Sequence, residues 1–153
     1  MPHRPAFLLP LLLAGLACAP PQAAPGSPGH AYGAGVRSRE VLKTGVAADG
    51  KRLSVPRFED PELTVLEVDL APGAETGWHL HPVPVHAYLL EGELTVTLAT
   101  GAARTYRKGE AIAEAVDLAH NGRNASSATA RLVVFYCGAK GVPNVVKQAP
   151  PVR

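Results

Sequence analysis

Three of the six histidines in this 153-residue chain have the spacing of a metal site. His79 and His81 are separated by one residue, and His120 lies in a second, distant segment. Residues i and i+2 of a β-strand point to the same face, so His79 and His81 can direct both imidazoles into one cavity. Neutral imidazole binds zinc, copper, iron, nickel and, less strongly, manganese. The pattern therefore predicts a divalent transition metal (Fe, Mn, Zn, Ni or Cu) held by His79, His81 and His120.

His86 is a possible fourth ligand, and its direction depends on the prolines at positions 82 and 84. If the strand keeps its phase from His81 onward, His86 points away from the cavity. A bulge or kink at the prolines would instead turn His86 inward. The sequence allows both arrangements.

Other residues near the histidines have both a structural and a functional interpretation. Trp78 and Tyr88 either line the pocket or pack between sheets, and strand parity favours packing for Trp78. Asn124 lies in a turn-rich segment, where asparagine usually bonds to the backbone. Cys137 ends an apolar run, which predicts a buried and inert thiol. Carboxylates can serve as acid or base only if the fold carries them to the cavity; the candidates are Glu75, Glu110 and Glu114.

The elements that must position these residues are expected to be strands. From Val41 onward, short β-branched runs alternate with turn signals, as is typical of a β-sandwich or barrel. Leu94, Val96 and Leu98 share one face, which predicts that they line the interior. A helix at residues 111–119 is disfavoured by the Lys-Gly turn before it. The expected strands span residues 64–70, 85–90, 94–98, 104–107 and 130–137.

Both histidine clusters resemble the paired motifs of the cupin family. The first motif contains a glycine, a His-x-His pair and a second glycine, and these places are held by Gly73, His79, His81 and Gly92. The second motif contains a glycine, a histidine and an asparagine, and these places are held by Gly109, His120 and Asn124.

The chain also departs from the family pattern. Ala115 and Asp117 replace the proline and glycine of the second motif, and Val85 or His86 stands where the first motif has a glutamate. Without that glutamate, three neutral ligands would leave the full dipositive charge on the metal. This charge would favour an anionic substrate or hydroxide.

The resemblance covers about residues 63–137. It implies an all-β cupin double-stranded β-helix, which is a jelly-roll barrel. The chain is similar in particular to small quercetin-dioxygenase-like cupins, which implies a metal-dependent enzyme acting on a small organic molecule. The alternative is a non-catalytic module that binds a metal or a small ligand. Cupins commonly pair through their sheets, which implies a homodimer.

The N-terminus predicts export. His3 and Arg4 precede an apolar run at residues 6–17, which is too short to span a membrane comfortably. The stretch Leu16-Ala17-Cys18 resembles a lipoprotein box, so a lipidated Cys18 that anchors the chain to a membrane is the alternative to a cleaved signal peptide. The expected location is periplasmic or secreted, with lipid anchoring in the second case.

Composition bounds the remaining possibilities. The formal net charge of +2 is small and no basic run is present, so nucleic acid is an unsupported partner. Two cysteines provide no disulfide framework. The expected organisation is a signal at residues 1–19, a flexible linker at 20–40, one cupin domain at 41–146 and a C-terminal tail at 147–153.

Overall fold

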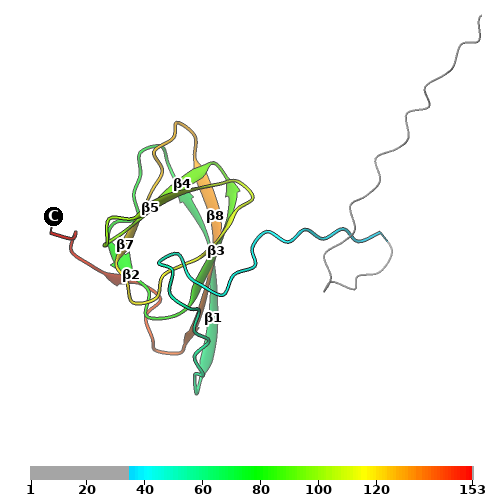
Figure 1. Cartoon of the computed structure of the whole chain (residues 1–153), viewed down its shortest axis with the longest axis vertical. Helices are drawn as coiled ribbons and strands as arrows, with labels where there is room; N and C mark the ends of the chain where they lie inside the picture. Colours follow the sequence, from blue (N-terminus) through cyan, green and yellow to red (C-terminus); the bar gives the residue numbers. More distant parts are fainter. Residues whose placement is uncertain (1–34, 153) are drawn as a thin grey trace, which may run out of the picture. The chain divides into compact units, whose positions relative to one another are not determined.

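Strands and loops make up residues 35–152, which are the residues described by the computed structural model (Figure 1). No helix occurs among these residues, and so none of them forms a helical span long enough to cross a membrane. The predicted signal segment, the lipid anchor at Cys18 and most of the predicted linker lie outside the described residues. Export therefore stays a prediction.

The strands form two antiparallel sheets. One sheet has the order β1-β8-β3-β6 and the other β5-β4-β7-β2-β9. Figure 1 shows β1, β3 and β8 on one side of the barrel and β2 and β7 on the other. The bounds are β1 Pro61–Leu70, β2 His79–Leu80, β3 Val85–Glu91, β4 Glu93–Leu98, β5 Ala103–Arg107, β6 Ala111–Ala113, β7 His120–Arg123, β8 Ala130–Ala139 and β9 Val146–Lys147. This arrangement confirms the predicted all-β class.

The core lies between the two sheets, and strand alternation builds it. Leu94, Val96 and Leu98 of β4 are all buried, which confirms that this face is the interior. Buried and less buried positions also alternate along β3 and β8, because successive side chains of a strand point to opposite faces. The buried apolar positions of these two strands are Val85, Ala87, Leu89, Ala130, Leu132, Val134 and Tyr136.

A buried asparagine ties together the two loops that flank the histidine strands. The Asn124 side-chain amide donates to the carbonyls of Leu70, Ala71 and Ala128, at 2.9, 3.2 and 2.7 Å. Its side-chain oxygen accepts from the backbone and hydroxyl of Ser126. All of the side chain's polar atoms are thus used inside the protein, and the predicted turn role of Asn124 is confirmed.

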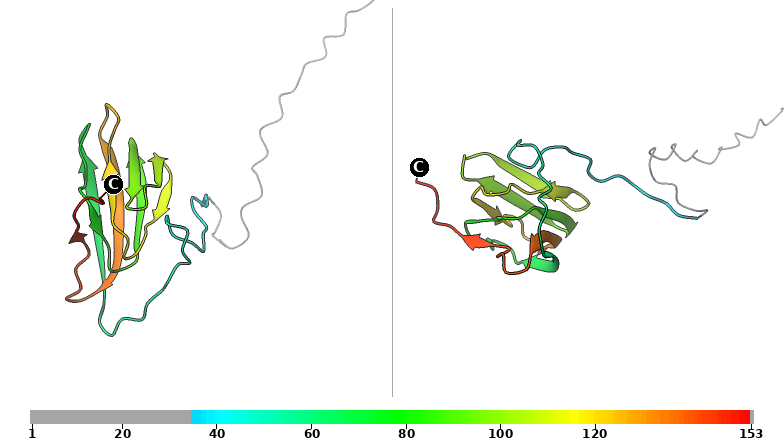
Figure 2. Two further views of the ribbon diagram at one scale, coloured as in Figure 1. Left: turned by 60° about the vertical axis from the view of Figure 1, so that its left-hand side comes forward. Right: turned by 90° about the horizontal axis from the view of Figure 1, so that it is seen from below.

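Residues 45–60, which precede β1, run along the outside of the barrel (Figure 2). This segment is anchored to β6 by a hydrogen bond from the amide of Ala48 to the carbonyl of Ala113, at 2.8 Å. It then reaches Phe58, which packs against the core cluster. The segment therefore covers part of one sheet from outside without contributing a strand of its own to either sheet.

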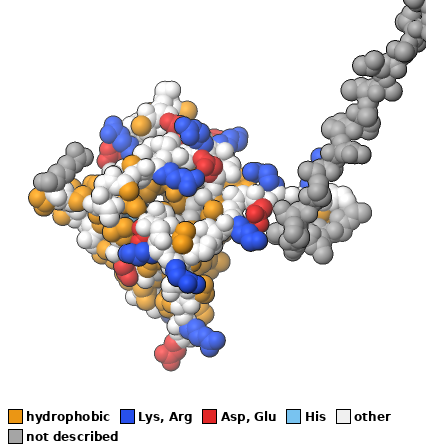
Figure 3. Space-filling view, viewed as in Figure 1, with side chains coloured by type: hydrophobic (Ala, Val, Ile, Leu, Met, Phe, Trp, Pro, Cys, Tyr) orange, Lys and Arg blue, Asp and Glu red, His pale blue; other side chains and the backbone are white. Residues whose placement is uncertain are grey.

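Charged side chains of both signs are intermingled on the face shown in Figure 3, and apolar side chains are exposed between them. Two of the predicted acid or base candidates form surface ion pairs: Glu75 lies 3.4 Å from Arg123, and Glu110 lies 3.2 Å from Arg104. Exposed pairs of this kind contribute about 0 to 1 kcal/mol each. Both carboxylates therefore lie at the surface of the protein.

Candidate metal centre

Strand register places His79 and His120 side by side. His79 of β2 is directly opposite His120 of β7, and directly opposite residues of an antiparallel pair point to the same face. His81 follows β2 with the same parity as His79 and is 2% exposed. The three ring centroids are 4.5 to 5.0 Å apart. The structure thus brings together the three histidines that the sequence singled out, with one ligand atom from each within 4.8 Å of the others.

Each imidazole is held by a backbone carbonyl. The Nδ1 atom of His79 lies 2.7 Å from the backbone carbonyl oxygen of Gly77. The Nδ1 atom of His81 lies 2.7 Å from the backbone carbonyl oxygen of Asn144. The Nδ1 atom of His120 lies 2.9 Å from the backbone carbonyl oxygen of Leu118. A carbonyl oxygen can only accept, so Nδ1 must carry the proton in all three rings. In a neutral imidazole, this leaves the lone pair on Nε2. A backbone acceptor on the far nitrogen is the usual way in which a protein orients a metal-binding histidine.

A carboxylate completes the cluster. Oε2 of Glu114 lies 3.1 Å from Nε2 of His81 and 3.1 Å from Nε2 of His120. Glu114 directly follows β6, where its backbone amide donates to the carbonyl of Val85 at 2.9 Å. The Glu114 side chain is 12% exposed. A negative charge therefore sits among the imidazoles in a largely desolvated position.

The pKa shifts reflect this arrangement. Burial raises the pKa of Glu114, but hydrogen bonds from His120 and His81 and their charge outweigh it and lower the pKa to about 2. Burial lowers the pKa of His120, whereas its bond to Glu114 and the carboxylate charge give a net raised pKa. The pKa of His79 is lowered, chiefly by burial. Glu114 is thus ionised at neutral pH.

The two contacts between Glu114 and the imidazole nitrogens require a positive charge. With Nδ1 protonated, a neutral imidazole presents only a lone pair at Nε2, and a lone pair does not attract a carboxylate oxygen. The two 3.1 Å contacts therefore need positive charge, supplied either by additional protons on His81 and His120 or by a cation bound between the groups. A divalent metal meets this need with ligand types that transition metals prefer.

Glu114 belongs to the site, although the sequence did not predict it as a neighbour of the three histidines. It was one of three acidic candidates, and the expectation of a site without a carboxylate is wrong. The glutamate position of the first motif is held by Val85, which is buried, or by His86, but Glu114 supplies a carboxylate from the segment after β6. The only signal was its position six residues before His120, within the second motif.

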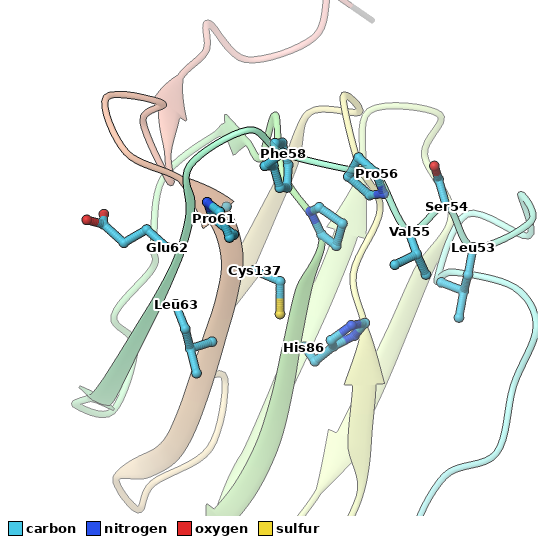
Figure 4. A pocket seen from close by; sticks show the side chains of 12 residues that line it. Leu53, Ser54, Val55, Pro56, Phe58, Pro61, Glu62, Leu63, His86 and Cys137 are labelled. Atoms are coloured by element: carbon cyan, nitrogen blue, oxygen red, sulfur yellow. The ribbon is translucent and has the colours of Figure 1, made fainter.

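His86 lies on the opposite face of the barrel wall from the three histidines. The prolines leave β3 in phase, so Val85 points into the core and His86 points outward. His86 lines an outer pocket of about 380 Å³ together with Cys137, Phe58 and Leu63 (Figure 4). In this structure His86 therefore does not join the cluster as a fourth ligand.

Cys137 corrects a second expectation. The thiol is exposed, not buried. Parity along β8 explains the difference, since Tyr136 takes the inward place and Cys137 the outward one. Tyr88 is half-buried and on the same outward phase of β3 as His86, so it does not line the histidine cavity.

The histidine cluster borders a small cavity and a wider opening. The cavity, of about 70 Å³, is lined by the three histidines, Glu114 and apolar side chains of both sheets. The opening, of about 550 Å³, shares His79 and Tyr136 with the cavity and is also lined by Trp78. Trp78 thus lines the approach to the cluster, whereas strand parity favours packing between the sheets for this residue. Burial and the Glu114 charge raise the pKa of Tyr136, so its hydroxyl is protonated at neutral pH.

Comparison with known proteins identifies the fold family. Residues 66–136 match the family model of the cupin domain. The chain contains a cupin domain. The match includes all three histidines and Glu114. No protein in the curated set matches this chain.

Several solved structures resemble this cupin. The DMSP lyase DddQ of Ruegeria pomeroyi aligns with a TM-score of 0.51 at 19% identity, over 60% of this chain and 45% of that chain. An uncharacterised protein with a double-stranded β-helix domain from Klebsiella pneumoniae aligns with a TM-score of 0.49 at 15% identity, over 61% of this chain and 90% of that chain. An oxalate oxidase in complex with the substrate analogue glycolate aligns with a TM-score of 0.47 at 25% identity, over 55% of this chain and 45% of that chain. The chain spans about half the length of the oxalate oxidase chains that it matches. The similarity to the lyase supports a shared fold alone, and the narrower quercetin-dioxygenase-like resemblance stays a prediction.

Proposed function

We propose that this cupin is a metal-dependent enzyme of oxygenase-like type that acts on a small organic molecule. His79, His81, His120 and Glu114 would hold a divalent transition metal. The observation that carries the proposal is the orientation of the imidazoles, because each Nδ1 donates to a separate backbone carbonyl and leaves Nε2 to bind.

The donor set fits such an ion. Three imidazole nitrogens and one carboxylate suit zinc, iron, manganese, nickel or copper, and the carboxylate reduces the net charge of the loaded site from +2 to +1. When bound, the metal would supply Lewis acidity, and a redox-active ion would also supply a meeting point for substrate and dioxygen.

The chain's own residues would perform the remaining tasks. Oε1 of Glu114 forms no hydrogen bond with the described residues, so it would be free to accept a hydrogen bond from a bound substrate or water. Apolar side chains that line the small cavity, among them Val68, Leu94 and Val134, exclude water from the cluster. This exclusion strengthens every electrostatic interaction inside the cavity.

Metal analysis tests the proposal. We expect untagged protein to contain close to one transition-metal ion per chain, measured by inductively coupled plasma mass spectrometry. His120→Ala should remove most of this metal, because two imidazoles hold a divalent ion much less firmly than three in a preformed site. His86→Ala is the matched control and should leave the metal content unchanged.

The outcomes separate the competing functions. Full metal occupancy in the His120→Ala variant would exclude the site described above. Metal-loaded protein that consumes no oxygen with any substrate in an oxygen-uptake screen would contradict the oxygenase-like assignment and support the non-catalytic binding module.

A further inference from the structure

A lysine stands in line with the metal-site histidines. Lys147 of β9 is directly opposite His79 of β2, and His79 is directly opposite His120 of β7. Directly opposite residues of antiparallel strands share a face and have Cβ atoms about 4.5 to 5.5 Å apart. The side chains of Lys147, His79 and His120 therefore form one row across the sheet. The row starts at the opening of the site and ends in its interior.

Lys147 lines this opening and has no acidic partner there. The opening of about 550 Å³ is bordered by Lys147, His79, Tyr136 and Trp78, and none of its lining residues is acidic. Among residues 35–152, no carboxylate forms an ion pair with the Lys147 ammonium. A positive group next to a cationic metal site repels it, and this repulsion is relieved when an anion lies between the two.

Tyr136 adds a neutral donor beside the lysine. Tyr136 is 6% exposed, and it lines both the opening and the small cavity. Its hydroxyl forms no hydrogen bond with any other described residue. A hydroxyl donor and an ammonium donor thus border one path toward the histidines, and an anionic group on that path would bind both.

Apolar side chains also line the same opening. Trp78 and Val145 line it together with Gln148. The volume of the opening falls within the range of ordinary small-molecule sites, which is about 300 to 1,000 Å³. A ligand with a carboxylate at one end and a planar or apolar body at the other fits this distribution of charge and apolar surface.

We propose that the opening selects a small carboxylate substrate, with Lys147 as the positioning residue for its carboxylate. This inference rests on the proposed metal-dependent function, since the bound carboxylate would lie between Lys147 and the proposed metal site. Lys147 orients the acid through charge and Tyr136 donates a hydrogen bond, while the indole of Trp78 contacts the apolar body of the acid. An uncharged molecule of the same shape lacks the first of these interactions.

Binding of a simple probe tests the inference. Benzoate is titrated calorimetrically into the zinc-loaded protein, and benzamide serves as its uncharged isostere. We expect benzoate to bind at least about tenfold more tightly than benzamide, since a hydrogen bond to a charged group is worth about that factor. Lys147→Gln should weaken benzoate binding about tenfold and leave benzamide binding unchanged. Lys147→Arg should preserve benzoate binding.

Lys108→Gln is the matched control, because Lys108 is exposed in the turn between β5 and β6 and lines neither the cavity nor the opening. It should leave the benzoate affinity unchanged. The zinc content of every variant is measured in parallel. Absence of zinc from the wild type would contradict the proposed function itself. Normal zinc content with equal benzoate affinity in wild type and Lys147→Gln, or with benzamide bound as tightly as benzoate, would overturn the role of Lys147 alone.

Discussion

At the scale of single residues, the candidate site depends on groups that have no recognisable spacing in the sequence. Three carbonyls from three different loops hold the Nδ1 atoms of His79, His81 and His120. Any residue type can supply a backbone carbonyl, so no pattern of letters predicts these contacts. The histidines themselves were predictable because only a few residue types bind transition metals and because strand parity fixes which of them share a face.

The acid stability of the metal-free protein should depend on Glu114. Its pKa is about 2 in the folded protein against an ordinary value of 4.5. The folded state therefore binds the proton less readily than the unfolded state. The resulting stabilisation is present above pH 4.5 and is lost as the pH falls toward 2. We expect the melting temperature of the wild type to fall more steeply below about pH 5 than that of Glu114→Gln.

The measurement is a series of thermal melts followed by circular dichroism in the presence of a chelator. Glu59→Gln is the control, because Glu59 is exposed and lies outside the strands. This control should melt in parallel with the wild type. Parallel curves for the wild type and Glu114→Gln would show that Glu114 is not stabilised as an anion in the folded protein.

At the scale of elements, the tight connection between β3 and β4 admits only glycine at Gly92. Its φ is +70°, and an added Cβ would lie 2.5 Å from the carbonyl oxygen of Thr129 and 2.9 Å from Cα of Ala130. Both contacts are with backbone, which cannot move aside as a flexible side chain can. We expect Gly92→Ala to lower the free energy of unfolding by about 3 kcal/mol or more.

Gly101→Ala provides the comparison for Gly92→Ala. Gly101 also has a positive φ, of +90°, but an added Cβ would meet nothing within 4 Å. This variant isolates the backbone strain, which should cost about 1 kcal/mol. Denaturant unfolding gives both values. Equal losses in the two variants would show that the close approach to Thr129 contributes nothing.

The longer strands were predictable from the sequence, and the shortest were not. Residues 64–70, 85–90, 94–98, 104–107 and 130–137 all lie in strands, because alternation over several residues gives a clear periodic signal. β9 has only two residues and was not predicted, although it carries Lys147. The direction of His86 also required the structure, because a sequence does not reveal whether two prolines shift a strand's phase.

At the scale of the whole molecule, an apolar outer face supports the predicted homodimer. Leu63 and Val65 of β1 are 63% and 47% exposed, and Phe135 of β8 is 38% exposed. The register places Val65 opposite Phe135, so these side chains are neighbours on the outside of the sheet. A second copy of the chain would remove this surface from water. We expect light scattering at micromolar concentration to give the mass of a dimer, and Phe135→Glu to give that of a monomer.

Val46→Glu introduces the same charge at an exposed valine outside this face and should leave the dimer intact. A monomeric wild type, or a Phe135→Glu variant that remains dimeric, would contradict pairing through the outer face of β1 and β8.

The hydrogen bond between His81 and Asn144 links residues that are 63 positions apart. During synthesis, His79 and His81 therefore emerge well before the carbonyl that orients His81 and before β9 exists. Until the rest of the domain has folded, they are two flexible imidazoles whose preference among metals follows general affinity. Only the folded barrel offers the oriented nitrogens together with the Glu114 carboxylate. The compartment in which folding finishes, with the metals available there, would thus determine which ion the proposed site binds. If the chain is exported as its N-terminal sequence predicts, that choice is made outside the cytoplasm.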